Sequence, residues 1–79
     1  MFFYTYVLLS LADNKLYIGW TDDLKHRLGQ HEKGAVTATR SRRPLRLVYF
    51  EAGRDRSKAI AREKYLKTGF GRRFLKGRL

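Results

Sequence analysis

The chain has no cysteine among its 79 residues and only seven Asp and Glu against eighteen Lys and Arg. Without cysteine, neither a disulfide framework nor a zinc-thiolate cluster can hold the fold together. It also lacks a long hydrophobic run. The apolar stretch from Phe2 to Leu9 is too short for a membrane span, contains two tyrosines and has no basic flank. We therefore expect neither a signal peptide nor a membrane segment, and take the cytoplasm as the default location.

The size of the chain predicts one domain covering residues 1–79, in which nearly every apolar residue is needed for the core. Hydrophobic residues make up 43% of the chain, and Tyr, Phe and Trp are well represented. This content is enough for a core and argues against disorder despite the high charge.

The net charge of +11 lies entirely in the second half of the chain. Residues 1–39 carry four Lys/Arg and four Asp/Glu, whereas residues 40–79 carry fourteen Lys/Arg and three Asp/Glu. A one-sided basic field is typical of polyanion binders, because neutralising phosphates releases condensed counterions. A solubilising surface or contact with an anionic membrane are the alternatives, but solvation alone does not require one sign of charge. The pattern favours nucleic acid.

Two tyrosine triplets fall on two neighbouring predicted strands. Phe2 to Ser10 is rich in β-formers and almost continuously hydrophobic, which predicts a central strand. An Asp-Asn turn within Ala12 to Lys15 separates it from a second strand, Leu16 to Trp20, so the two form an antiparallel hairpin. The hairpin is expected to bring Tyr4-Thr5-Tyr6 beside Tyr17-Ile18-Gly19.

A helix is predicted to follow the hairpin. Thr21 is the expected N-cap and two aspartates stand in the first turn, so the helix should run to about Lys33 and end at Gly34. The side chains of Arg27 and His31 lie one turn apart on the arc that also carries two leucines. This arc is expected to face the sheet.

The remainder of the chain predicts one loop, one strand and one or two helices. The segment from Ala35 to Arg43 has the composition of an exposed loop, and Leu45 to Phe50 is a third strand. Asp55 or Ser57 is expected to cap a second helix that runs to about Thr68 and ends at Gly69. The last ten residues form a short helix or fray.

Basic side chains in these later segments are candidates for gripping a nucleic acid backbone. The loop and the start of the third strand hold four arginines within seven positions. The expected nucleic-acid-binding residues are Arg40, Arg42, Arg43, Arg46, Lys67, Arg72 and Arg73.

Glu63 falls on the apolar arc of the second predicted helix. A carboxylate is rarely buried without a partner, because its desolvation costs several kcal/mol. One possible partner is an arginine of this chain. The other is a hard divalent ion such as Mg²⁺, which accepts a single protein carboxylate when water and substrate phosphate supply the other ligands. The position of Glu63 leaves both open.

Taken together, these residues resemble a known family. Tyr4-Thr5-Tyr6, Tyr17-Ile18-Gly19, Arg27, His31 and Glu63 occur in the order and spacing of the GIY-YIG nuclease family, in particular its small stand-alone bacterial members. The resemblance runs from Phe3 to about Lys67 and includes Pro44-Leu45-Arg46-Leu47-Val48-Tyr49 at the third strand. It implies an α+β fold in which a three-stranded antiparallel sheet is flanked by helices in the order β-β-α-β-α(-α).

The resemblance also implies roles for individual residues. It implies that Tyr6 or Tyr17 deprotonates or orients the attacking water, that Arg27 holds the scissile phosphate and that His31 supports the base. Glu63 corresponds to the single metal-binding glutamate, with one Mg²⁺ or Mn²⁺ as the cofactor. Tyr4 and Gly19 complete the two triplets as supporting residues.

The chemistry of phosphodiester hydrolysis suits these residue types. A planar guanidinium can bind two nonbridging oxygens as they gain charge. A phenol has a pKa near ~10, so it is a poor base until a metal, a cation or an imidazole acceptor takes or lowers its proton.

Each residue also has a purely structural explanation. The tyrosines could be hydrogen-bonded strand aromatics, and Gly19 could serve close packing. His31 could cap its own helix, and Arg27 could pair with Glu32 or Glu63. For each residue taken alone, except Arg27 and Glu63, the structural explanation is the better one. The order and spacing of all these residues together favour a functional site.

The chain departs from the family pattern at four places. Tyr4 stands where the motif has glycine, Glu32 follows His31 where asparagine is frequent, and Ala38 precedes Thr39 where tyrosine often stands. An asparagine found after the metal-binding glutamate in many members has no counterpart, because Asn14 is the only asparagine.

The sequence therefore predicts a metal-dependent endonuclease of low sequence specificity that acts on DNA rather than RNA. We expect no association with membranes. A protein partner or additional subunit that supplies specificity is compatible with this prediction. The missing asparagine favours the alternative, a DNA- or RNA-binding module of the same fold with little or no cleavage. A structural protein that coats RNA would explain the charge but not Arg27, His31 and Glu63.

Overall fold

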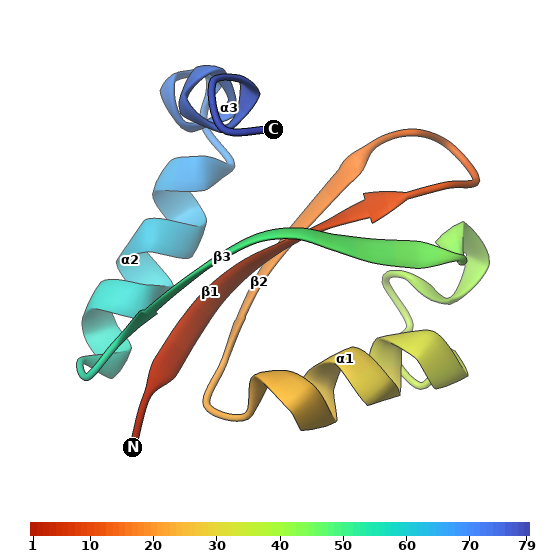
Figure 1. Ribbon diagram of the computed structural model, residues 1–79, viewed down its shortest axis with the longest axis horizontal. Coiled ribbons are helices and arrows are strands. Elements are labelled where there is room, and N and C mark those ends of the chain that lie inside the picture. Colours follow the sequence, from red (N-terminus) through yellow and green to blue (C-terminus); the bar gives the residue numbers. More distant parts are fainter.

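The computed structural model describes residues 1–79, and in it a three-stranded sheet lies among three α-helices (Figure 1). The elements, in chain order, are β1 (Phe3–Ser10), β2 (Leu16–Thr21), α1 (Leu24–Lys33), the 3₁₀ turn η1 (Arg40–Arg42), β3 (Leu45–Gly53), α2 (Arg56–Leu66) and α3 (Gly69–Lys76). The predicted order of strands and helices is confirmed, including the last helix.

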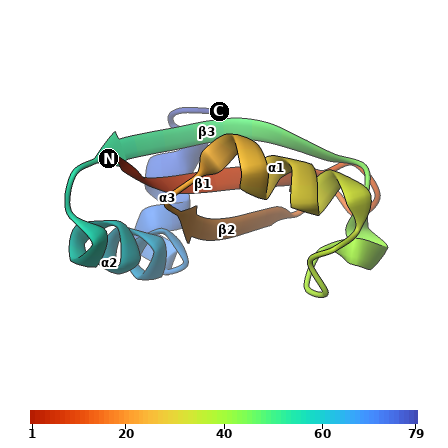
Figure 2. The same cartoon turned by 90° about the horizontal axis from the view of Figure 1, so that it is seen from below.

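The sheet has the order β2-β1-β3, and both pairings are antiparallel. Figure 2 shows the three strands side by side with β1 in the middle. The β1–β2 connection turns at Asn14, whose φ of 59° is the left-handed conformation that asparagine tolerates in turns. In the resulting register Tyr6 lies directly opposite Gly19. The predicted central strand and hairpin are confirmed.

Neighbouring residues of β1 point to opposite faces of the sheet, and each face is covered by different helices. The hydroxyl of Thr5 donates to the carbonyl oxygen of Ala59, which places α2 on one face. The phenol of Tyr6 meets His31, which places α1 on the other. The main apolar cluster lies on the α2 face and comprises Val7, Ile18, Leu66 and Leu75.

The predicted start of α1 is wrong by two residues. Thr21 ends β2, and the N-cap is Asp23, whose carboxylate accepts the backbone N–H of His26 at 3.1 Å. The Thr21 hydroxyl instead accepts the N–H of Asp23 at 3.1 Å, so it shapes the turn before the cap. The predicted end is correct, because Gly34 adopts a φ of 79° and its N–H returns to the last turn of the helix.

The predicted end of α2 is also wrong, because the helix ends at Leu66 rather than near Thr68. The Thr68 hydroxyl accepts the N–H of Gly71 at 3.2 Å and so caps a new helix. Gly69, expected to end α2, is therefore the first residue of α3. Phe70, the second residue of α3, is 68% exposed.

The helix α3 is held closely against the end of α2. A Cβ atom built on Gly71 would lie 2.2 Å from the carbonyl oxygen of Tyr65 and 2.4 Å from Cα of Leu66, so only glycine allows this approach. The guanidinium of Arg62 lies between the rings of Tyr65 and Phe74, at 5.1 and 4.7 Å from their centroids. None of the helices is long and apolar enough to cross a membrane.

Gly71→Ala is expected to destabilise the protein by about 1–3 kcal/mol, because its methyl group collides with rigid backbone rather than with a movable side chain. The matched control is Gly69→Ala in the same helix, where a Cβ meets no atom within 4 Å. Urea unfolding of both variants measures the difference. Equal stability of the two variants would contradict the close approach of α3 to α2.

Candidate active site

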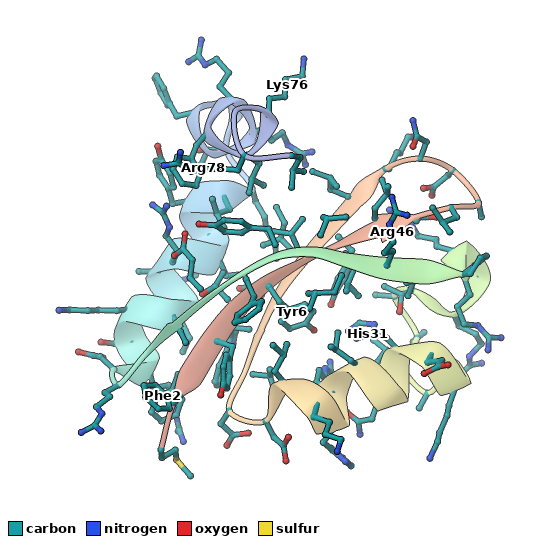
Figure 3. All side chains as sticks on the ribbon, in the orientation of Figure 1. Phe2, Tyr6, His31, Arg46, Lys76 and Arg78 are labelled. Carbon is teal, nitrogen blue, oxygen red and sulfur yellow. The ribbon has the colours of Figure 1, made fainter.

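A hydrogen bond between Tyr6 and His31 joins the central strand to α1. The phenol oxygen lies 2.8 Å from Nε2 of His31, and both side chains are only 1% exposed. In Figure 3 the two labelled side chains point toward each other between the sheet and the helix. The structural explanation of His31 as a helix cap is wrong, because both ring nitrogens are engaged by side chains.

The second ring nitrogen of His31 meets Thr39. Nδ1 lies 2.7 Å from the Thr39 hydroxyl oxygen, and Thr39 is completely buried. Thr39 comes from the loop before η1, where its N–H bonds to the carbonyl oxygen of Val36. The three side chains form a continuous chain of hydrogen bonds from this loop to the sheet.

Gly19 provides the space that the Tyr6 phenol occupies. A Cβ atom at Gly19 would lie 2.6 Å from the Tyr6 hydroxyl oxygen, which is closer than any ordinary contact. The close-packing explanation of Gly19 is thus correct in kind, and what packs there is the phenol itself.

Tyr17 completes an aromatic cluster around His31. Its ring centroid lies 5.3 Å from that of His31 and 6.5 Å from that of Tyr6. Tyr17 is only partly buried, in contrast to Tyr6, and β2 is an edge strand. Of the two predicted catalytic tyrosines, Tyr17 is the more accessible.

Arg27 is partly buried and forms no ion pair with Glu32 or Glu63. Its guanidinium donates to the side-chain oxygen of Gln30 at 3.0 Å, which uses one of five N–H donors. Most of its hydrogen-bonding capacity is left for another acceptor.

Glu63 lies on α2, which contacts both β1 and the edge strand β2. Its side chain is 18% exposed, and its one ion pair is with Lys67 at 3.7 Å. A charge-assisted hydrogen bond is normally about 2.7–2.9 Å long, so this pair is loose. The cation that meets Glu63 is a lysine, not the arginine that we considered.

The charges of this cluster act on one another. Burial raises the pKa of the Tyr6 phenol, the nearby Arg27 guanidinium opposes this, and the negative charges that Tyr17 and Glu63 can carry add to the rise. Burial also lowers the pKa of His31, and the positive charge of Arg27 lowers it further. His31 is therefore neutral, and Tyr6 keeps its proton at neutral pH.

The predicted basic loop is partly tied to the protein. Arg42 forms an ion pair with Asp13 at 2.9 Å, which lowers the pKa of that carboxyl to about 2. Arg40 donates to the carbonyl oxygen of Gly34, and Arg43 donates to that of Glu32. Arg40 and Arg43, with His31, help to line a cavity of about 670 Å³ between α1, the loop and β3.

The other predicted basic residues lie elsewhere. Arg46 pairs with Leu9 in the sheet register and so points away from the face that carries Tyr6. In Figure 3 it lies apart from Tyr6 and His31. Arg72 and Arg73 are exposed on α3, and Arg73 covers the Phe70 ring at 4.9 Å.

Sequence reasoning missed Thr39 and Gln30, which hold His31 and Arg27 in place. Gln30 lies three residues after Arg27 on the same helix, a spacing that signals a side-chain contact. For Thr39 no periodic signal existed, because it belongs to an irregular loop whose path the sequence does not specify.

The comparisons with known proteins agree with this geometry. The family model of the GIY-YIG catalytic domain matches residues 2–76. The chain belongs to the GIY-YIG family. The resemblance inferred from the two tyrosine triplets is thereby confirmed, as is the GIY-YIG fold.

Similar proteins carry the name UPF0213. The UPF0213 protein of Lactiplantibacillus plantarum is 50% identical over 82% of this chain and 66% of its own length. A UPF0213 protein of Clostridium perfringens is 42% identical over 81% of this chain and 69% of its own length. The chain thus spans about two thirds of these relatives. The solution NMR structure of a UPF0213 protein from Bacillus halodurans has a TM-score of 0.60 at 30% identity, covering 98% of this chain and 84% of that one.

Gly19→Ala is expected to destabilise the fold by about 1–3 kcal/mol, because the added methyl group displaces a buried phenol that is fixed by His31. Gly53→Ala is the matched control: Gly53 is also a strand glycine, but a Cβ there meets open space. Urea unfolding measures both. A Gly19→Ala protein as stable as the control would show that the phenol is not fixed.

The ring of His31 is expected to titrate below 6.5, the ordinary pKa of histidine, because burial disfavours its charged form. Since the unfolded chain then binds the proton more readily, stability should fall as the pH drops below 6.5 toward the folded pKa. NMR titration of a His26→Gln variant, which leaves a single histidine, gives the value. A midpoint at or above 6.5 would be incompatible with an enclosed imidazole.

Proposed function

We propose that this protein is a metal-dependent endonuclease that hydrolyses phosphodiester bonds in DNA with little sequence specificity. The observation that carries the proposal is the convergence of Tyr6, Tyr17, His31 and Arg27 on one face of the sheet, with Glu63 near enough to act on the Tyr6 phenol. Membership of the GIY-YIG family supports the reaction class.

Arg27 is the residue proposed to bind the scissile phosphate. Its guanidinium keeps four N–H donors beyond the bond to Gln30, enough to grip two phosphate oxygens. Donors that are fixed before the substrate arrives stabilise the charge that develops on these oxygens. The bond to Gln30 limits the rotation of the Arg27 side chain.

The Glu63 carboxylate fits a single hard divalent ion such as Mg²⁺ or Mn²⁺. It is largely buried, its one ion pair is loose, and a carboxylate oxygen is the ligand type that such ions take. No group of three or more His, Cys, Asp and Glu side chains that could hold a metal ion occurs anywhere in the chain, so Glu63 would be the single side-chain ligand. When bound beside Glu63, the ion would supply positive charge near the phosphate and the leaving oxygen.

The end of the chain offers a surface for the nucleic acid backbone. From residue 64 onward it carries Lys64, Lys67, Arg72, Arg73, Lys76 and Arg78 and no acidic residue. Figure 3 shows Lys76 and Arg78 at α3. These cations give a field of one sign that binds phosphates irrespective of base sequence.

A second candidate is a nucleic-acid-binding module that cuts slowly or not at all. It is favoured by the absence of any asparagine after Glu63 and by the contact of Lys67 with the carboxylate proposed to hold the metal. Both candidates require binding that weakens steeply with salt.

Nicking of supercoiled plasmid with Mg²⁺ or Mn²⁺ is expected for the wild-type protein. Arg27→Ala and Glu63→Gln should each lower the rate by about 100-fold or more, because each removes a group that acts on the transition-state charge. Lys25→Ala and Glu32→Gln are matched controls: both residues are exposed on α1, and they should leave the rate unchanged.

If the wild-type protein nicks no faster than Arg27→Ala and Glu63→Gln, the endonuclease is excluded. Salt-dependent binding to DNA with no such nicking would leave the binding module. Binding that is insensitive to salt would exclude both candidates.

A further inference from the structure

The hydrogen-bonded triad Thr39–His31–Tyr6 has three polar hydrogens, one on each hydroxyl and one on the neutral imidazole, but only two hydrogen bonds within it. A neutral imidazole offers one N–H donor and one bare nitrogen acceptor. Each of its neighbours is a hydroxyl, and each hydroxyl carries one hydrogen. One hydroxyl therefore donates to the imidazole and the other accepts from it. The hydrogen of the accepting hydroxyl is left over and must find an acceptor outside these three side chains.

The two hydroxyls are both enclosed but have different neighbours, and the neighbours indicate which hydrogen is left over. Thr39 is 0% exposed, and its hydroxyl has His31 as its one hydrogen-bond partner. A leftover hydrogen there would be a buried donor without an acceptor, which is costly. The Tyr6 side chain is also enclosed, at 1% exposed, but its hydroxyl lies beside Arg27, the residue proposed to bind the phosphate, so a bound phosphate oxygen would accept its hydrogen.

We propose that Thr39 donates its hydroxyl hydrogen to Nδ1 of His31, so that His31 carries its proton on Nε2 and donates to the Tyr6 phenol. Thr39 is in this way a positioning residue that acts through His31. A doubly protonated ring would leave both hydroxyl hydrogens without acceptors, and burial already keeps His31 neutral.

This direction of donation assigns different roles to the two tyrosines, on the assumption that the proposed nuclease function is correct. Nε2 has no lone pair for the Tyr6 proton, so His31 cannot act as the base that removes it. Tyr6 then presents its own O–H toward the substrate as a hydrogen-bond donor to a phosphate oxygen or to water. Tyr17, which is partly exposed, remains as the tyrosine that orients or deprotonates the attacking water.

The tautomer can be measured directly, without substrate or metal. In the His26→Gln background, two-bond ¹H–¹⁵N correlation spectra of His31 are expected to show Nε2 as the protonated nitrogen and Nδ1 as the bare one. The Thr39 hydroxyl proton should be protected from exchange with water and observable, whereas the Tyr6 hydroxyl proton, which has no acceptor within the hydrogen-bonded triad, should exchange faster. Protonated Nδ1, or a protected Tyr6 hydroxyl with an exchanging Thr39 hydroxyl, would overturn the proposal.

Two substitutions at Thr39 separate its hydroxyl from its bulk. Thr39→Val keeps the volume and removes the donor, so the Nδ1 resonance should move to that of a nitrogen without a hydrogen bond. Thr39→Ser keeps the hydroxyl and should preserve the wild-type resonance. In the nicking assay, Thr39→Val should lower kcat about tenfold with little change in KM, and Thr39→Ser should restore it.

The NMR arm distinguishes failure of this proposal from failure of the nuclease function. If Nε2 is protonated but the wild-type protein does not nick DNA, the proposed role of Thr39 stands and the endonuclease function is excluded. If the protein nicks DNA but carries its proton on Nδ1, the endonuclease function stands and the proposed role of Thr39 is excluded. Identical Nδ1 resonances in Thr39→Val and the wild type would also exclude it, provided that Thr39→Val keeps the backbone spectrum of the fold.

Discussion

The hydrogen bond between Tyr6 and His31 is the constraint on which the arrangement of the site depends. It joins the middle strand to α1 in the interior, and both side chains are almost fully enclosed. Its geometry requires a glycine opposite Tyr6, because any side chain at position 19 would occupy the space of the phenol. On the other side of the ring, Thr39 meets Nδ1 of His31 and so joins the loop before η1 to the same network.

The two faces of the sheet have different tasks. The α2 face holds the main apolar cluster and the close approach of α3, so it supplies much of the packing. The α1 face holds the polar and aromatic side chains of the candidate site. Glu63 lies on the helix of the first face and acts electrostatically on Tyr6 of the second. The narrow sheet, with β2 at its edge, would let residues from both faces serve the proposed site.

Much of the fold could be predicted from the sequence because its signals were local. The β-forming residues of Phe3–Ser10 and the turn residue Asn14 predicted the hairpin, and Gly34 predicted the end of α1. The errors fell at helix boundaries, where several side chains can serve as the cap. Asp23 and not Thr21 caps α1, and Thr68 begins a new helix instead of ending the previous one.

The candidate site was predictable as a set of residues but not as a network. The spacing of Arg27 and His31 placed them on one face of α1, and their order relative to the tyrosines gave the family, which is confirmed. Their roles remain proposals. The contact of Thr39 with His31 joins residues eight apart through an irregular loop, and the pairing of Arg42 with Asp13 spans twenty-nine positions. Such contacts depend on the tertiary path of the chain, which composition and periodicity do not describe.

The location of a bound paramagnetic ion tests whether a single metal site lies beside Glu63. Mn²⁺ should be added in small amounts to ¹⁵N-labelled protein in the presence of a short DNA duplex, and the broadening of each resonance recorded. We expect the signals of Glu63, Tyr17 and Arg27 to broaden first, and Glu63→Gln to abolish this effect. Broadening centred on Asp22 and Asp23, or broadening that Glu63→Gln leaves unchanged, would contradict a single metal site beside Glu63.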